Sequence, residues 1–390
     1  MKEANERVQP VLDQLVQGGT EVGLQVAAYL DGRLVVDAWA GMANPAAGRP
    51  VTGDTLFKAQ SCTKGIVATC IHILADRGML DYDMPIAHYW PEFATHGKER
   101  VTIRHALTHQ AGIPQMPEQT TLEMMCDWDT MCTAIADLEP LWEPGTKTGY
   151  HALTFGWILG EVLRRVDGRS IARFVQEEIC RPLGTEDIYI GTTEAVEPRV
   201  ATPVTPSPPS NPTPLPPGLL LLRAIPALTN PAAKRHPDVQ RALNRASIPS
   251  SGGFMTARAL ARHYAALAQG GELNGVHILT PELIRVASQL QTEAFDEVLG
   301  PVSYPAPVRK ALGYWVGGQL TPANTYWGSL GLRNTTFGHT GMGGLVAFAD
   351  PEQRFAFAFL KNFSAPMNAP LPHSAYMVAQ AARAALGLTG

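Results

Sequence analysis

The chain has 390 residues, of which 45% are hydrophobic and 17% are charged, and its formal net charge is −4. This composition excludes a disordered protein and is sufficient to bury a large core, either in one large domain or in two lobes that share a cleft. Because there is no surplus of Lys and Arg, we expect no binding to nucleic acid or to a membrane surface, and small neutral molecules are the expected partners.

The lack of a signal-peptide core and of a membrane span predicts a cytoplasmic protein by default, and the cysteines predict free thiols. Residues 1–7 lack the apolar core of a signal peptide, and no segment approaches the roughly 18 apolar residues of a membrane span. The five cysteines are odd in number and show no C-x-x-C spacing, so we expect free buried thiols rather than disulfides or zinc ligands. They are Cys62, Cys70, Cys126, Cys132 and Cys180. The sequence makes no prediction of the oligomeric state.

Strands are predicted near both ends, with helices between them. Residues 23–30 and 33–40 are β-rich runs around Asp31-Gly32, a strong hairpin signal. A second pair of strands, 344–349 and 354–360, precedes an Ala-rich helix at about 374–386. The helix-like segments between the two pairs lie near 61–77, 102–109, 152–167, 170–180 and 256–269. Sheet near both ends implies that the helical middle is inserted.

Residues 198–217 depart from this pattern, with nine prolines in twenty positions. Such a segment can be neither a helix nor a central strand, and it should run as an extended, polyproline-like strap. The strap is either a linker or a lid over the cleft, and a proline motif for a partner protein is a third alternative.

Ser61 and Lys64 are the first candidate catalytic pair. Residues 65–75 are apolar on nearly every side, which predicts a helix buried inside the domain. Residues three apart lie on one face of such a helix, so Ser61 Oγ and Lys64 Nζ can come within hydrogen-bond distance. Burial disfavours the ammonium, so the pKa of Lys64 should fall and neutral Lys64 could accept the serine proton. A bare S-x-x-K motif is weak by itself, and the buried helix is what supports it.

Two more segments carry candidate residues. Tyr150 stands between a Pro144-Gly145 turn and a helix that begins near residue 152. Beside a lysine ammonium its pKa should be lowered, and the phenol could act as a general base; packing is the alternative role. Residues 338–344, Gly-His-Thr-Gly-Met-Gly-Gly, enter a predicted strand, and their N–H groups could bind an oxyanion. The alternative there is a tight turn with a histidine at the strand edge.

These three segments, in this order, resemble the serine β-lactamase and penicillin-binding-protein family, most closely its class C-like branch, which includes the family VIII carboxylesterases. Segments 89–93 and 101–113 add to the resemblance. It implies a serine β-lactamase-like α/β (α+β) fold, an antiparallel sheet flanked by helices with an inserted helical lobe. We expect one domain, 1–390, with an α/β lobe at about 1–60 and 250–390 and a helical lobe at about 61–249 that includes the strap.

The resemblance also implies roles for individual residues. Ser61 would be the nucleophile, Lys64 its base partner and Tyr150 the first residue of the family's Y-x-N motif. The N–H groups of Ser61 and Met342 would form the oxyanion hole. The substrate-binding candidates are His151 and the three residues at the K-T-G position, His339, Thr340 and Gly341. No metal or organic cofactor is expected.

Two departures from the family pattern bear on the substrate. Ala152 stands where Y-x-N has asparagine, and His339 stands where K-T-G has lysine. In the family these two groups help hold a carboxylate and an amide, so their absence favours neutral esters over β-lactams or D-Ala peptides. The expected function is a carboxylesterase that works through an acyl-enzyme. The alternatives are an acyltransferase that uses an alcohol or amine as acceptor and, less favoured, a β-lactamase, a D-Ala peptidase or a catalytically dead binding protein.

Other patterns receive structural interpretations. His105 and His109 have the spacing of a zinc H-E-x-x-H motif, but residue 106 is Ala, so structural histidines are expected. Cys62 should face away from the nucleophile as a core residue. Lys147-Thr148-Gly149 spells K-T-G, yet it lies in a turn before Tyr150, so we interpret it as coincidence. No G-x-S-x-G nucleophile elbow occurs.

Overall fold

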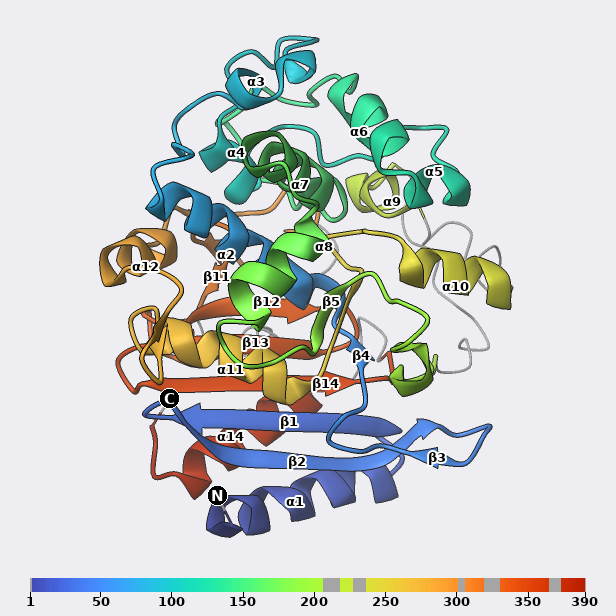
Figure 1. Ribbon diagram of the computed structural model, residues 1–390, viewed down its shortest axis with the longest axis vertical. Helices are drawn as coiled ribbons and strands as arrows, with labels where there is room; N and C mark the ends of the chain where they lie inside the picture. The colour runs from blue at the N-terminus through green and yellow to red at the C-terminus, as the bar shows by residue number, and fades with distance from the viewer. Residues whose placement is uncertain are drawn as a thin grey trace.

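The computed structural model describes residues 2–205, 218–226, 236–300, 306–318, 330–364 and 373–389. In these ranges the main feature is a nine-stranded antiparallel sheet with the order β3-β2-β1-β14-β13-β12-β11-β10-β9 (Figure 1). Its strands are β1 (Gly23–Leu30), β2 (Arg33–Asn44), β3 (Arg49–Pro50), β9 (Thr292–Ala294), β10 (Val308–Lys310), β11 (Trp315–Val316), β12 (Phe337–Gly341), β13 (Leu345–Asp350) and β14 (Phe355–Lys361).

Both predicted strand pairs are confirmed. β1 pairs with β2 in the first hairpin, and β13 pairs with β14 in the second, where Asp350 lies opposite Phe355. β1 also pairs with β14, with Val26 opposite Phe359. Strands that are far apart in the sequence therefore lie side by side in the middle of the sheet.

The sequence of β14 explains why helices pack on both faces of the sheet. Its Phe-Ala-Phe-Ala-Phe run is fully buried, and successive side chains point to opposite faces. The phenylalanines belong to a core shared with α1 (Lys2–Gln17) and α14 (Ser374–Ala385). The alanines belong to a core shared with α11 (Ala257–Ala268), which is itself rich in alanine. Small side chains on both partners allow α11 to pack closely on the sheet (Figure 1).

Helix α1 was not predicted from the sequence. Its buried residues are Ala4, Val8, Leu12 and Leu15, which recur at the spacing of one helical face. They pack against β2 and α14 and cover one face of the sheet. Only four residues form this apolar stripe. The polar residues around them and the internal Pro10 make the helix difficult to predict from the sequence.

The predicted helical segments are confirmed, and helix α2 (Thr63–Asp76) lies at the centre of the protein. Twelve of its fourteen residues are buried, and it packs against both α7 (Thr154–Asp167) and β12. The other helices are α3 (Ile86–Tyr89), α4 (Ile103–Leu107), α5 (Leu122–Cys126), α6 (Trp128–Ala136), α8 (Ile171–Phe174), α9 (Leu220–Ala224), α10 (Pro237–Arg245) and α12 (Pro281–Ser288).

Short elements complete the described structure. Strand β6 joins β4 and β5 in a small three-stranded sheet, and β7 and β8 form a hairpin. These elements are β4 (Phe57–Lys58), β5 (Ile188–Ile190), β6 (Gly253–Met255), β7 (Glu272–Leu273) and β8 (Val276–His277), the 3-10 turns η1 (Gln60–Cys62), η2 (Pro91–Phe93) and η4 (Glu197–Arg199), and the π-helical turn η3 (Val175–Cys180).

Only the beginning of the predicted proline strap lies within the described residues. Val204 forms a parallel bridge with Phe363, and the N–H of Ala201 donates to the carbonyl of Leu56. The first two residues of the strap, Pro198 and Arg199, lie in the 3-10 turn η4, so the expectation of an extended chain holds only for residues 200–205, which contain no helix. Residues 206–217, on which the choice between linker and lid depends, lie outside the described residues.

The thiols largely follow the prediction. All five cysteines are free, and four are buried, but Cys126 is exposed, because the short helix α5 buries none of its residues. Among the described residues, no helix combines the length and the apolar character needed to cross a bilayer.

Candidate active site

Ser61 lies in turn η1, directly before helix α2. The preceding residue, Gln60, has a φ of +50°, in the left-handed region that non-glycine residues rarely adopt. Hydrogen bonds hold this backbone in place, because Thr63 Oγ1 donates to the carbonyl of Gln60 and accepts from the N–H of Gly253. The turn that presents Ser61 is thus fixed by strand β6.

Lys64 is fully buried beside Ser61, as the spacing predicted. Its Nζ lies 3.2 Å from Ser61 Oγ, 2.8 Å from the carbonyl oxygen of Ala152 and 3.1 Å from that of Ser250. Burial lowers the pKa of Lys64 well below its usual value, and no carboxylate of the described residues is paired with it to oppose this effect. The expected direction of the shift is confirmed, so the neutral amine is favoured.

Tyr150 contacts both Ser61 and Lys64. Its side chain is 7% exposed, its hydroxyl is hydrogen-bonded to Ser61, and its ring centroid lies 4.7 Å from Lys64 Nζ. The expected lowering of its pKa is wrong, because burial raises the pKa of Tyr150 well above 10. Since Lys64 is itself driven toward the neutral form, it supplies no ammonium to stabilise a phenolate. Tyr150 is therefore present as a phenol.

Strand β12 runs directly beside η1. The thiol of Cys62 points to this strand and donates to the carbonyl of His339 at 3.4 Å, so it is a buried contact rather than a second nucleophile. A Cβ added to Gly341 would lie 2.9 Å from the carbonyl oxygen of Ala59, which explains why a glycine is needed there. The strand ends at Gly341, and Met342 follows in a turn with its side chain 46% exposed.

His339 is held by Trp315 on the neighbouring strand β11. The Nε1–H of Trp315 donates to His339 Nε2 at 2.8 Å, so Nδ1 must carry the proton of the neutral ring, and it lies 2.6 Å from the carbonyl oxygen of Thr340. Burial, with Lys64 nearby, lowers the pKa of His339 well below 6.5. The ring is therefore neutral, and both of its nitrogens are already bonded within the protein.

His151 does not fit the substrate-binding role expected of it. It is fully buried, and its Nε2 accepts from the N–H of Ile113 while its Nδ1 lies 2.6 Å from the carbonyl oxygen of Gly149. No nitrogen is left for a ligand. Burial lowers its pKa to about 4, so it stays neutral as a structural residue that shapes the loop around Tyr150.

Three patterns set aside in the sequence analysis have structural roles. His105 completes a capping box with Thr102 at the start of α4, and Nδ1 of His109 accepts from the N–H of His151. Lys147, in the literal K-T-G triplet, is 54% exposed and lies 3.5 Å from Glu297. Within the described ranges, no group of three or more His, Cys, Asp or Glu residues is placed to hold a metal ion.

Besides Ser250, whose carbonyl accepts from Lys64, sequence analysis missed three residues that surround the site. Trp315 contacts the rings of both Tyr150 and His339, and Asp296 and Lys310 contact the segment that carries Tyr150. All three lie on or beside β9, β10 and β11, short strands that carry no recognisable motif. The one signal in the sequence was Lys310 at the end of the β-rich run Val-Arg-Lys, because a lysine buried in a strand is unusual.

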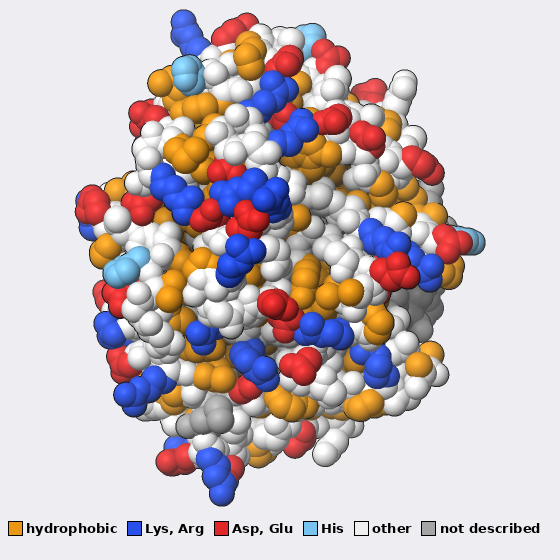
Figure 2. All heavy atoms as spheres, in the orientation of Figure 1, with side chains coloured by type: hydrophobic (Ala, Val, Ile, Leu, Met, Phe, Trp, Pro, Cys, Tyr) orange, Lys and Arg blue, Asp and Glu red, His pale blue; other side chains and the backbone are white. Residues whose placement is uncertain are grey.

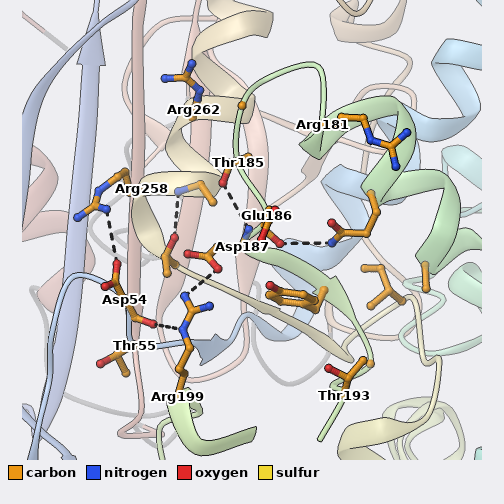
Figure 3. A pocket seen from close by; sticks show the side chains of 18 of the residues that line it. Asp54, Thr55, Arg181, Thr185, Glu186, Asp187, Thr193, Arg199, Arg258 and Arg262 are labelled. Carbon is orange, nitrogen blue, oxygen red and sulfur yellow. Dashed lines mark hydrogen bonds and ion pairs between the residues drawn. The ribbon is translucent and has the colours of Figure 1, made fainter. Parts of the chain in front are cut away.

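A separate surface cavity of about 1550 Å³ is lined by none of the candidate catalytic residues. Figure 3 shows its charged lining, in which Arg199 pairs with Asp187 at 2.7 Å and Arg258 lies 3.7 Å from Asp54. Neither Ser61, Lys64 nor Tyr150 lines it. On the face of the protein seen in Figure 2, positive and negative side chains are likewise intermingled rather than gathered into a patch of one sign.

The sequence is similar to that of known β-lactamase-like proteins over most of its length. The beta-lactamase family model matches residues 10–381. The esterase/beta-lactamase LipL of Mycobacterium tuberculosis is 35% identical over 354 residues, which cover 87% of this chain and 77% of that protein.

Two solved structures are similar over nearly the whole chain. A family VIII carboxylesterase has a TM-score of 0.83 and 32% identity, covering 98% of this chain and 97% of the other. A penicillin-binding protein homologue from Caulobacter crescentus has a TM-score of 0.84 and 34% identity, with the same coverage. The expected β-lactamase-like fold is confirmed.

Proposed function

The chain belongs to the beta-lactamase family, and from this premise we propose that it is a carboxylesterase that cleaves small neutral esters through an acyl-enzyme on Ser61. The observation that carries the proposal is the position of Lys64 Nζ among three oxygens, with no carboxylate partner in the described part of the chain. A neutral amine has two hydrogens and one lone pair. The hydrogens match the carbonyls of Ala152 and Ser250, which leaves the lone pair to accept the Ser61 proton.

Acylation then follows from the positions of three side chains. Ser61 Oγ attacks the ester carbonyl carbon, its proton passes to Lys64 Nζ, and the carbonyl oxygen becomes an oxyanion. The bond to the alkoxy oxygen breaks, and the leaving group takes a proton from the Tyr150 hydroxyl, which regains one from Lys64. A phenol with a raised pKa suits this proton-transfer role better than that of the initial base.

Deacylation uses the same groups in reverse. Water attacks the acyl carbon, gives its proton to Lys64, and Ser61 leaves with a proton returned from the pair. We assign the oxyanion hole to the N–H groups of Ser61 and Met342, and the contact between η1 and strand β12 supports this assignment. No observation on the described residues favours an alcohol or amine over water as the acceptor.

The preference for neutral esters rests on His339 and Ala152. His339 is neutral with both nitrogens bonded, and Ala152 presents a methyl group where the family pattern has an amide. The buried cation nearby, Lys310, is paired with Asp296. Neither His339, Ala152 nor Lys310 would therefore offer a substrate carboxylate a charge-assisted hydrogen bond, which is worth about 1.5–3 kcal/mol.

The test compares an ester with a β-lactam on the same preparation. We expect kcat/KM for p-nitrophenyl butyrate to exceed that for the cephalosporin nitrocefin by several orders of magnitude, with both activities absent in Ser61→Ala. The comparison matters because LipL is named for both activities. Comparable values for the two substrates would refute the assignment to neutral esters.

A further inference from the structure

Asp296 and Lys310 form a buried ion pair beside the segment that carries Tyr150. Their side chains are 0% and 1% exposed, and Lys310 Nζ lies 2.6 Å from Asp296 Oδ2. Lys310 ends strand β10, and Asp296 follows strand β9. A buried pair of this kind is weak evidence for stability, because desolvation opposes the attraction between the charges. Stability therefore does not explain why Asp296 and Lys310 also bind the segment around Tyr150.

The second carboxylate oxygen of Asp296 is bound to backbone. Oδ1 accepts from the N–H of Tyr150 at 3.0 Å and from those of Val298 and Leu299 at 2.9 Å each. Burial by itself would raise the pKa of Asp296, but Lys310 and the backbone amides outweigh it, and the pKa is lowered. An ionised carboxylate thus fixes the backbone of Tyr150 to the loop after β9.

Lys310 holds the same segment from the other side of Gly149. Its Nζ donates to Thr148 Oγ1 at 2.6 Å, and that hydroxyl donates in turn to the carbonyl of Thr108. The N–H of Glu297 also donates to the carbonyl of Thr148. Lys310 therefore fixes Thr148, and Asp296 fixes Tyr150, two residues further along the same loop.

We propose that Asp296 and Lys310 are positioning residues that hold the Tyr150 hydroxyl against Ser61. This inference rests on the proposed role of Tyr150 in proton transfer. The ring of Tyr150 follows its backbone, and the hydroxyl must reach Ser61 while the ring stays beside Lys64. A displacement of about 1 Å in such a site can lower the rate by about 10²-fold.

A double-mutant cycle separates positioning from general stability. Asp296→Asn keeps the shape of the side chain but removes its charge, and it is made in the wild type and in Tyr150→Phe. With p-nitrophenyl butyrate we expect kcat to fall by about 10²-fold in the wild-type background with KM little changed. In Tyr150→Phe the same change should cause no further loss, because the hydroxyl being positioned is already absent.

The outcomes distinguish this inference from the proposed function. An equal fold-loss in both backgrounds would overturn the positioning role while leaving the role of Tyr150 intact. An unchanged kcat in Tyr150→Phe alone would instead remove the role of Tyr150, and the inference with it. A full kcat in folded Asp296→Asn would also overturn the inference.

Two more variants guard against misfolding and general effects. Glu161→Gln removes another carboxylate that is 1% exposed, bonded to Arg164 and Arg165 on α7, and it should lower the melting temperature without changing kcat. If Asp296→Asn does not fold, Thr148→Val replaces it in the cycle, since valine keeps the shape of threonine and removes the acceptor for Lys310. Its loss of kcat should again vanish in Tyr150→Phe, and an unchanged kcat would overturn the inference.

Discussion

The Nζ of Lys64 lies 3.1 Å from the carbonyl oxygen of Ser250, a residue 186 positions later in the chain. The hydroxyl of Ser250 donates to the carbonyl of Leu153 and accepts from the N–H of Gly156, both at 2.7 Å. One buried serine thus fixes the lysine amine and the start of helix α7. Within the described ranges the amine is held by neutral acceptors alone, which favours its neutral form.

Replacing Ser61 by alanine should abolish turnover and leave the fold intact. Removing one member of a cooperating catalytic set lowers kcat by about 10⁴ to 10⁶. The measurement is p-nitrophenyl butyrate hydrolysis, with circular dichroism to confirm folding. More than about a tenth of wild-type activity in the purified variant would show that Ser61 is not the nucleophile.

The pH dependence should report the neutral amine of Lys64. Because burial lowers its pKa well below 10.5, the protonated, inactive form dominates only on the acid side. We therefore expect kcat/KM to rise with pH and to level off well below pH 10.5, after subtraction of the Ser61→Ala background. Lys98→Met, which removes another buried lysine, should leave this profile unchanged in the folded enzyme. A profile still rising through about pH 10 would mean an unshifted lysine.

Tyr150→Phe keeps the ring and removes only the hydroxyl that contacts Ser61. We expect kcat to fall by about 10² to 10⁴, the usual contribution of a general acid or base. Tyr264→Phe is the matched control, since Tyr264 is fully buried and its hydroxyl has no hydrogen-bond partner among the described residues. If Tyr150→Phe kept the same kcat as Tyr264→Phe and the wild type, Lys64 would be left as the only proton-transfer residue.

Gly341→Ala should separate strand β12 from the turn that carries Ser61. The added Cβ would lie 2.9 Å from the carbonyl oxygen of Ala59, so one of the two backbones must move. A shift of the oxyanion-binding edge should lower kcat by about 10²-fold. Gly300→Ala, where no atom of the described residues lies within 4 Å of the added Cβ, should retain full activity. Full activity in Gly341→Ala would argue against the assigned oxyanion hole.

A thiol reagent should modify the folded enzyme without inactivating it. Cys126 is exposed, whereas Cys62, beside the nucleophile, is 0% exposed and burial raises its pKa. We expect rapid labelling of one thiol per chain, lost in Cys126→Ser, with esterase activity unchanged. Rapid inactivation that persists in Cys126→Ser would indicate an accessible thiol near Ser61.

Local patterns were sufficient to predict the hairpins, the buried helix after Ser61 and the reach of Lys64 to Ser61. These features depend on residues close together in the chain, such as the three-residue spacing from Ser61 in η1 to Lys64 in α2. The pKa of Tyr150 was predicted in the wrong direction because Lys64 was assumed to be a charged ammonium. Burial favours the neutral amine of Lys64 instead, so no nearby positive charge lowers the pKa of Tyr150. The division into two lobes stays a prediction.

The residues that sequence analysis missed act across large separations. Ser250 reaches Lys64 through its backbone carbonyl, which no residue type reveals. Asp296 reaches Tyr150 in the same way, through a backbone N–H. His151 was grouped with the substrate-binding residues because it adjoins Tyr150, yet its ring turns into the backbone of residues 113 and 149.

The pairing of β1 with β14 also constrains the order of events during synthesis. β1 leaves the ribosome more than 300 residues before its neighbour β14, and Ser61 precedes strand β12 by a similar interval. Until the last strands emerge, one edge of β1 is unpaired and open to association with other chains. Ser61 likewise lacks strand β12 beside it. A nascent or truncated chain that ends before residue 337 should therefore be both prone to aggregate and unable to form an acyl-enzyme.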